Sequence, residues 1–230
     1  MYAMKFTKEE IRKSMLLYAV TDRMWLNEGE TLISVAEEVL KNGATFLQIR
    51  EKDLNEDDFE AEAEVLHALC AKYRIPFVVN DSVEIALRCN ADGVHVGQSD
   101  IKGRDIRALI GPDAILGISA GTVQEAEAAE AAGADYIGVG AVFTTGTKKD
   151  ARSLTMEQLR AIRNAVSIPI VAIGGINSGN IMRLAGSGVD GVAVVSAIFA
   201  APHPGEATAG MLKLAEEMLS AKTVRGEGNE

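Results

Sequence analysis

The feature that most constrains the fold of this chain is a regular alternation of short β-branched runs with longer helical patterns. Most of the short runs are nearly continuous apolar stretches, which suits parallel strands covered on both faces better than half-solvated antiparallel strands. The eight predicted strands are 16–21, 45–49, 77–80, 93–96, 115–119, 136–139, 170–173 and 191–194. The pattern therefore predicts a parallel sheet buried on both sides.

Each predicted strand is followed by a predicted helix, and this order indicates an α/β fold of the (β/α)8 TIM-barrel type. An open doubly wound sheet is the rival architecture. Its first βα turn should carry a glycine-rich dinucleotide fingerprint, whereas Thr21-Asp22-Arg23 follows the first strand here. The predicted helices are 32–41, 57–72, 83–88, 101–110, 123–132, 156–164, 179–185 and 207–220.

Several predicted helices end in a phrase with a central glycine, namely Asn42-Gly43-Ala44, Ala132-Gly133-Ala134 and Ser187-Gly188-Val189. Glycine can adopt the left-handed conformation that closes a helix, so these phrases predict αβ turns. The 230 residues fit one barrel domain over 1–221. The polar tail 222–230 and the first few residues are predicted to be disordered.

Composition excludes several classes of partner. The net charge is −10, and no run of Lys and Arg forms a stripe for nucleic acid or an anionic membrane surface. No apolar run approaches the roughly 20 residues that cross a bilayer, and residues 1–14 lack the apolar region of a signal peptide. We therefore expect a cytoplasmic protein in which Cys70 and Cys89 are buried, reduced thiols. The oligomeric state stays open, and a homo-oligomer is compatible with the sequence.

Polar residues follow the second, third and fourth predicted strands, at the end of a barrel where active sites lie. Gln48-Ile49-Arg50-Glu51-Lys52 supplies two cations that can bind an anion, although an ordinary solvated loop is the alternative. Asp81 and Asp100 follow adjacent strands, and two carboxylates suit Mg²⁺, which takes its other oxygens from water and phosphates. Either aspartate could instead cap the following helix.

Later strand ends carry hydroxyls and glycines. His95 lies within an apolar strand, where a core or pocket position is more usual than acid–base catalysis, and Ser119 is better explained as a hydrogen-bonding contact than as a nucleophile. The loop 144–150 combines hydroxyls with cations suited to an oxyanion, with a mobile lid as the alternative. Gly174-Gly175 and Ser196 predict a phosphate pocket after strands seven and eight.

Taken together, these motifs closely resemble the thiamine-phosphate synthase family over about 18–199. The motifs that carry the resemblance are Gln48-Ile49-Arg50-Glu51-Lys52, Asn80-Asp81, Asp92-Gly93-Val94-His95-Val96-Gly97-Gln98 with Asp100, Thr145-Gly146-Thr147-Lys148, and Gly174-Gly175 with Val195-Ser196. The resemblance implies a magnesium-dependent transferase that joins a hydroxymethylpyrimidine diphosphate to a thiazole phosphate. Pyrophosphate leaves and thiamine monophosphate forms.

The resemblance also implies a role for each matching residue. Pyrimidine diphosphate would be bound by Gln48, Ile49, Arg50, Glu51, Lys52, Asn80, Ser119 and Lys148, and Arg50, Lys52 and Lys148 would be catalytic. Thiazole phosphate would be bound by Thr145, Gly146, Thr147, Gly175, Val195 and Ser196. Asp81 and Asp100 would bind the metal. Departures from the common family pattern, at Ser82, Ser99, Ala141 and Thr144, concern loop rigidity more than charge and bear on substrate affinity.

Two other functions compete with this hypothesis. A thiazole tautomerase on the same barrel would need the phosphate pocket but neither a diphosphate clamp nor a metal pair. The joint presence of Arg50, Lys52, Asp81, Asp100 and Lys148 favours the synthase. A noncatalytic barrel that sequesters phosphorylated vitamins is the second alternative, and turnover of the two substrates distinguishes it from an enzyme.

Overall fold

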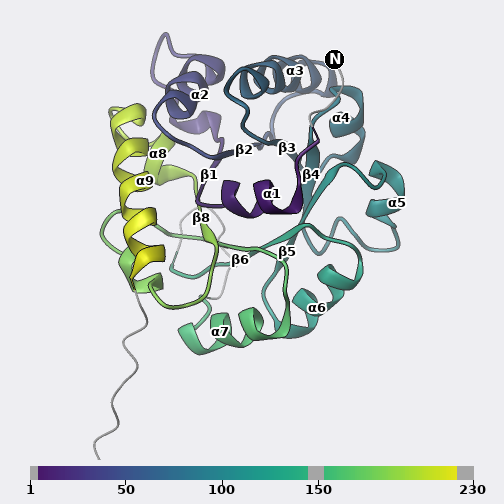
Figure 1. Ribbon diagram of the computed structural model, residues 1–230. Coiled ribbons are helices and arrows are strands. Elements are labelled where there is room, and N and C mark those ends of the chain that lie inside the picture. The colour runs from purple at the N-terminus through teal and green to yellow at the C-terminus, as the bar shows by residue number, and fades with distance from the viewer. Residues whose placement is uncertain (1–4, 145–152, 222–230) are drawn as a thin grey trace, which may run out of the picture.

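The computed structural model describes residues 5–144 and 153–221, and its centre is a closed barrel of eight parallel strands paired in chain order (Figure 1). All eight predicted strands are confirmed, with ends that differ by one residue at most. The strands are β1 (Leu17–Val20), β2 (Phe46–Ile49), β3 (Phe77–Asn80), β4 (Gly93–Val96), β5 (Ile115–Ala120), β6 (Tyr136–Gly140), β7 (Ile170–Ile173) and β8 (Gly191–Val194). The predicted TIM-barrel fold is therefore correct.

Helices surround the barrel and cover the outer face of its strands (Figure 1). The predicted closing glycines Gly43, Gly133 and Gly188 all have positive φ, which confirms the αβ turns. The α-helices are α1 (Lys8–Ser14), α2 (Leu32–Lys41), α3 (Glu56–Tyr73), α4 (Val83–Arg88), α5 (Ile106–Ile110), α6 (Val123–Ala131), α7 (Met156–Ala165), α8 (Ser196–Phe199) and α9 (Pro204–Ser220), and the 3₁₀ turns are η1 (Arg23–Trp25) and η2 (Ile181–Leu184).

Helix α9 begins at Pro204, three residues before the predicted start at 207, and three other helical segments differ more from prediction. The helix predicted over 101–110 begins only at Ile106, because Gly103 adopts φ +73° and the Asp105 side chain caps the Ala108 amide. The segment 179–185 forms the 3₁₀ turn η2 instead of an α-helix. Helix α1 was not predicted, although Thr7 and Glu10 form a capping box at its N-terminus. The predicted disorder of 1–4 and 222–230 concerns residues outside the described ranges.

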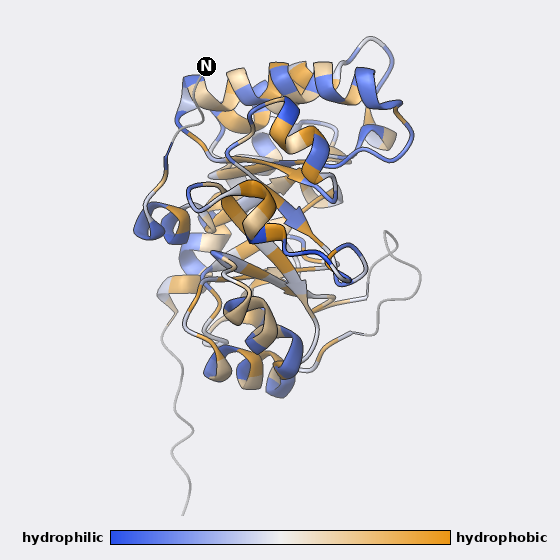
Figure 2. Ribbon diagram, turned by 90° about the vertical axis from the view of Figure 1, so that its right-hand side faces the viewer, coloured by the Kyte–Doolittle hydropathy of each residue, from blue (hydrophilic) through white to orange (hydrophobic). Residues whose placement is uncertain are grey.

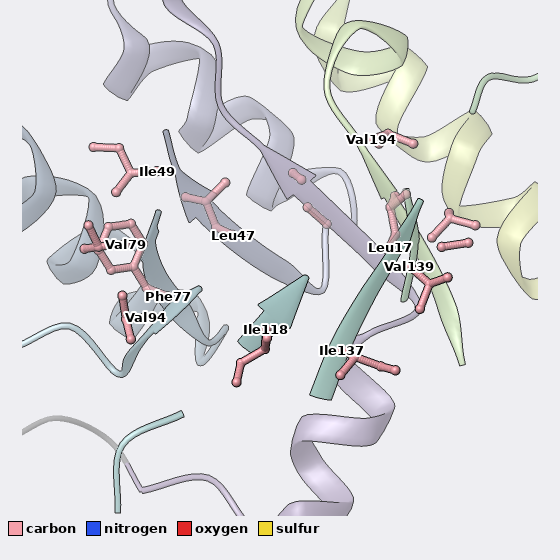
Figure 3. Packing of buried hydrophobic residues seen from close by; sticks show 14 of the residues in the cluster. Leu17, Leu47, Ile49, Phe77, Val79, Val94, Ile118, Ile137, Val139 and Val194 are labelled. Atoms are coloured by element: carbon pink, nitrogen blue, oxygen red, sulfur yellow. The ribbon is translucent and has the colours of Figure 1, made fainter. Parts of the chain in front are cut away.

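The alternation of side chains along each strand divides the buried residues into two layers. One layer lies between strands and helices and includes Leu17, Leu47 and Ile49, as Figure 3 shows. The other fills the barrel interior and includes Tyr18, Phe46 and Tyr136. Positions that face the interior therefore determine the floor of any site at the barrel mouth.

Helix α1 lies across the N-terminal end of the barrel (Figure 1). Its Ile11 and the following Met15 are at most 4% exposed and pack into the interior layer. Arg12 ties the helix to the barrel through an ion pair with Asp190. The hydropathy view shows helices that carry both polar and apolar residues around the strands (Figure 2). In the described ranges, no helix combines the length and apolar character needed to span a membrane.

Candidate active site

A cavity of about 290 Å³ opens at the C-terminal ends of the barrel strands. This is the end at which βα loops and strand termini supply the functional groups of a TIM barrel. Of the residues predicted to bind substrates, those that line the cavity are Gln48, Arg50, Asn80, Ser119, Gly175, Val195 and Ser196. Five of the eight strands supply these side chains or the loops directly after them, so the fold brings together segments far apart in sequence.

One side of the cavity is formed by polar side chains on β2 to β5, and we call it the side-chain wall. It comprises Gln48, Arg50, Asn80, His95 and Ser119. The first loops of the barrel hold the Arg50 segment in place. Its backbone N–H donates to the hydroxyl of buried Thr21 at 3.0 Å, and its guanidinium lies 3.8 Å from the Asp22 carboxylate. This wall therefore presents a cation and several amide and hydroxyl groups to a ligand.

The side chains that alternate with Gln48 and Arg50 are directed elsewhere. Ile49 is fully buried in the layer between strands and helices (Figure 3). The Glu51 side chain is 2% exposed and accepts a hydrogen bond from Arg23 at 2.8 Å. Arg23 also binds Glu62, whose pKa is raised because burial disfavours its charged form. Neither Ile49 nor Glu51 lines the cavity, and Lys52 is exposed on the loop beside it.

A chain of hydrogen bonds crosses the barrel interior beneath the cavity. Gln48 Nε2 donates to the Tyr18 hydroxyl at 2.5 Å, and the Tyr18 and Tyr136 hydroxyls are 2.8 Å apart. The Tyr136 hydroxyl lies 2.9 Å from His95 Nδ1, and His95 Nε2 lies 3.0 Å from Ser119 Oγ. Burial raises the pKa of both tyrosine hydroxyls, so they stay protonated at neutral pH. We call these five residues the interior chain.

Two glycines make room for the interior chain. A Cβ atom at Gly117 would lie 2.2 Å from Tyr136 Cζ and 2.5 Å from His95 Nδ1. A Cβ atom at Gly138 would lie 3.1 Å from His95 Cε1. Gly117 pairs in register with His95 on one side and with Tyr136 on the other. The missing side chain on β5 therefore creates the space in which the two rings meet.

The carboxylates predicted to bind a metal follow the adjacent strands β3 and β4. The Asp81 N–H donates to the His95 carbonyl at 2.8 Å, and the residue adopts φ +63°. The Asp100 carboxylate accepts a hydrogen bond from the Gly97 N–H at 3.0 Å, which folds it back over the end of β4. Neither aspartate is the N-cap of the following helix, because Ser82 caps α4 and Asp105 caps α5. In the residues described, three or more His, Cys, Asp or Glu do not gather as a metal-binding group.

The opposite side of the cavity is formed mainly by backbone on β6 to β8, and we call it the glycine wall. It comprises Gly138, Gly140, Gly174, Gly175 and the segment 195–196. Gly174 and Gly175 adopt φ +103° and +67°, and Ser196 begins helix α8 as predicted. A Cβ atom on Gly175 would lie 2.4 Å from the Thr144 carbonyl oxygen. Main-chain N–H groups that a ligand can approach closely suit a phosphate.

Four predicted ligands of the substrates, Thr145, Gly146, Thr147 and Lys148, lie outside the described residues. The loop that carries them is placed up to Thr144, and the preceding Phe143 ring stacks under Arg183 at 4.9 Å. That cation–π contact joins the start of the loop to η2. The described part of the loop therefore begins beside the glycine wall.

Sequence reasoning missed Tyr18, Tyr136 and Gln98 as site residues. Tyr18 and Gln98 line the cavity, and Gln98 donates to the Ser119 carbonyl at 2.6 Å. The available signal was the position of each tyrosine within a barrel strand, since a buried phenol needs a hydrogen-bond partner. The identity of those partners depends on pairing across the barrel, which single strands do not reveal.

Comparison with known proteins agrees with this geometry. The family profile described as thiamine monophosphate synthase matches residues 17–198. A thiamine-phosphate synthase from Clostridium beijerinckii is 52% identical over 184 residues, covering 80% of this chain and 88% of that protein. One from Clostridium tetani is 48% identical over 182 residues, covering 79% of this chain and 87% of that protein.

Solved structures extend the comparison to the fold. The thiamine phosphate pyrophosphorylase from Pyrococcus furiosus superposes with a TM-score of 0.82 at 39% identity, covering 91% of this chain and 99% of that one. An orotidine 5′-phosphate decarboxylase from Pyrococcus horikoshii, at 17% identity and a TM-score of 0.62, shares the fold alone. The profile match and the sequence identities both span most of the barrel and its mouth. The chain belongs to the thiamine monophosphate synthase family.

Proposed function

We propose that this chain joins hydroxymethylpyrimidine diphosphate to thiazole phosphate, releasing pyrophosphate and forming thiamine monophosphate. The observation that carries the proposal is the pairing of two unlike walls in one cavity. The side-chain wall offers Arg50 and hydrogen-bonding side chains to a diphosphate. The glycine wall offers main-chain groups to a second, singly phosphorylated substrate. Family membership supports the same pair of substrates.

The chemistry requires no protein nucleophile. The carbon–oxygen bond to diphosphate breaks, pyrophosphate leaves with the electron pair, and the resulting pyrimidinylmethyl cation is captured by the thiazole nitrogen. The protein contributes by holding the two rings in line and by neutralising the charge that develops on pyrophosphate. In this scheme Arg50 acts from the side-chain wall, and Lys52 and Lys148 supply further positive charge to the leaving diphosphate.

We further propose that Asp81 and Asp100 hold Mg²⁺ at the rim. Their residue type fits, because Mg²⁺ prefers a few carboxylate oxygens and completes its shell with water and phosphate oxygens. Their position also supports the proposal, since Ser82 and Asp105 already perform the helix capping that would otherwise explain them. When bound, the metal would neutralise charge on the leaving diphosphate.

A two-substrate assay with and without magnesium tests the function. We expect many equivalents of pyrophosphate per enzyme when both substrates and Mg²⁺ are present, and none when either substrate is omitted. Metal-independent isomerisation of a single thiazole substrate would identify a tautomerase instead. Binding of both substrates without any release of pyrophosphate would identify a noncatalytic binding protein.

The variant Asp81→Asn tests the metal site. We expect the fold to persist and the magnesium concentration for half-maximal activity to rise at least about ten-fold, because one anionic ligand is lost. The matched control is Asp113→Asn, since Asp113 is exposed and pairs with Lys5 beside the N-terminal helix. An unchanged magnesium dependence in Asp81→Asn would remove Asp81 from the metal site.

A further inference from the structure

We propose that the interior chain fixes the Ser119 hydroxyl as a hydrogen-bond donor toward the ligand, with Tyr136 as the positioning residue at its centre. Four hydrogen bonds connect Gln48 on β2 with Ser119 on β5 through Tyr18, Tyr136 and His95. The two end members of the interior chain, Gln48 and Ser119, line the cavity. The inference deepens the proposed function, because it assigns a state to a group that would contact the pyrimidine substrate.

The donor-to-acceptor direction of the hydrogen bonds in the interior chain follows from the number of protons that each residue carries. The Gln48 amide nitrogen can only donate, so the Tyr18 oxygen accepts that bond. The Tyr18 hydroxyl then has one proton left to donate, and Tyr136 lies 2.8 Å away. If Tyr136 donated to Tyr18 instead, the Tyr18 proton would have no acceptor among the residues that the structure describes. A buried hydroxyl proton without an acceptor is costly, so the first direction is favoured.

The remaining bonds then have one consistent arrangement. Because Tyr136 accepts from Tyr18, its own proton is directed to His95 Nδ1 at 2.9 Å. A neutral imidazole carries one proton, which is therefore on Nε2 and is donated to Ser119 Oγ at 3.0 Å. The Ser119 proton is left to point into the cavity. His95 in this state donates to Ser119 and is not a base that could activate it as a nucleophile.

The surroundings of the interior chain hold it in this geometry. Gly117 and Gly138 leave space for the Tyr136 and His95 rings, and a Cβ atom at Gly117 would overlap both. The backbone of Ser119 is fixed by Gln98, which donates to its carbonyl at 2.6 Å. The Tyr18 and Phe46 rings pack with centroids 4.3 Å apart, which fixes the first phenol as well. The hydroxyl of Ser119 therefore faces an acceptor atom of the ligand, such as a heteroaromatic ring nitrogen, from a rigid support.

The tautomer of His95 in the ligand-free protein is the direct test. The chain has three histidines, and ¹⁵N labelling with a His95→Asn variant assigns the His95 signals. We expect a protonated Nε2 and an unprotonated Nδ1. In Tyr136→Phe, which keeps the ring but removes the hydroxyl, we expect the two nitrogen shifts to move toward each other as both tautomers become populated. A protonated Nδ1 in the unmodified protein, or unchanged shifts in Tyr136→Phe, would overturn the proposal.

A double-mutant cycle tests the consequence for the ligand. Ser119→Ala and Tyr136→Phe should each lower kcat/KM for the diphosphate substrate about ten-fold, the effect of losing one hydrogen bond. The double variant should be no worse than Ser119→Ala, because both changes remove the same donor. Additive losses would mean that Tyr136 acts only through packing, and would overturn the proposal.

Tyr73→Phe is the matched control for the kinetic test. The Tyr73 hydroxyl lies on α3, far from the cavity lining, and donates to Glu37. Its removal should leave kcat/KM unchanged. The NMR measurement needs neither substrate nor turnover, so a chain with the expected His95 tautomer but no condensation activity would contradict the proposed function while leaving this inference intact.

Discussion

The two walls of the cavity are built in opposite ways. The side-chain wall depends on atoms that project from the strands, such as the guanidinium of Arg50 and the hydroxyl of Ser119. The glycine wall depends on atoms that are missing, because a Cβ at Gly174 or Gly175 would lie within 2.6 Å of a neighbouring residue. We therefore expect that removing side-chain atoms impairs the side-chain wall, whereas adding side-chain atoms impairs the glycine wall. Substitutions on each wall test this rule.

The largest effect is expected from truncation on the side-chain wall. Arg50→Ala should lower kcat/KM about 10²- to 10³-fold, because a preorganised charge beside the leaving diphosphate is lost. Steady-state kinetics with both substrates measure the effect. Arg50→Lys should recover only part of it, since lysine keeps the charge but not the planar fork. The exposed Arg160 on α7 provides the control, and a loss in Arg160→Ala equal to that in Arg50→Ala would contradict a local role.

Addition on the glycine wall should have an intermediate effect. Gly175→Ala places a methyl group 2.4 Å from the Thr144 carbonyl at a φ of +67°. We expect a loss of about 1–3 kcal/mol in the free energy of unfolding and a rise in KM for thiazole phosphate, while KM for the diphosphate changes little. Denaturant unfolding and kinetics measure the two quantities.

Gly103→Ala is the control for that substitution. Gly103 has a similar φ of +73°, but nothing lies within 4 Å of its Cβ position. Both variants share the cost of the left-handed conformation, so their difference isolates the contact with Thr144. Equal KM values for thiazole phosphate in the two variants would show that space at the glycine wall is unimportant for this substrate.

The smallest effect is expected at the cysteines, which belong to neither wall. Cys70 and Cys89 are both buried, as predicted, and burial raises the pKa of the Cys89 thiol to about 11 and that of Cys70 well above its ordinary value. At pH 8 the reactive thiolate fraction is therefore lower than for a free cysteine. A thiol reagent should react slowly with the native protein and fast in urea. Rapid inactivation of the native enzyme would show that a thiol supports the site.

The sequence predicted the frame of the molecule better than its interior. The strands 77–80, 93–96, 170–173 and 191–194 have the predicted bounds, because short apolar runs are recognised from local patterns. Helix α1 was missed because its short, highly charged sequence buries only Ile11 and Ser14. Helix α5 was extended too far because Gly103 interrupts an otherwise helical pattern.

The candidate site shows the same division. Arg50, Asn80, Gly175 and Ser196 could be placed at the cavity from their positions after strands. The direction of the Glu51 side chain could not be predicted, because its ion pair with Arg23 joins two separate loops. The contact between the hydroxyls of Tyr18 and Tyr136 spans 118 residues and depends on closure of the barrel. Such contacts follow from tertiary packing and have no local signature.

Helix α1 closes the N-terminal end of the barrel, and this closure has a consequence for kinetics. Ile11 and Met15 fill that end, and the cavity opens at the C-terminal ends of the strands, so both substrates of the proposed reaction would enter and leave there. Under the proposed function two molecules share this opening, so a molecule bound against Tyr18 and His95 would leave after one bound nearer the rim. Because one opening would serve both substrates and both products, binding and release would occur in a fixed order. Inhibition by each product should therefore follow the pattern of a compulsory-order mechanism.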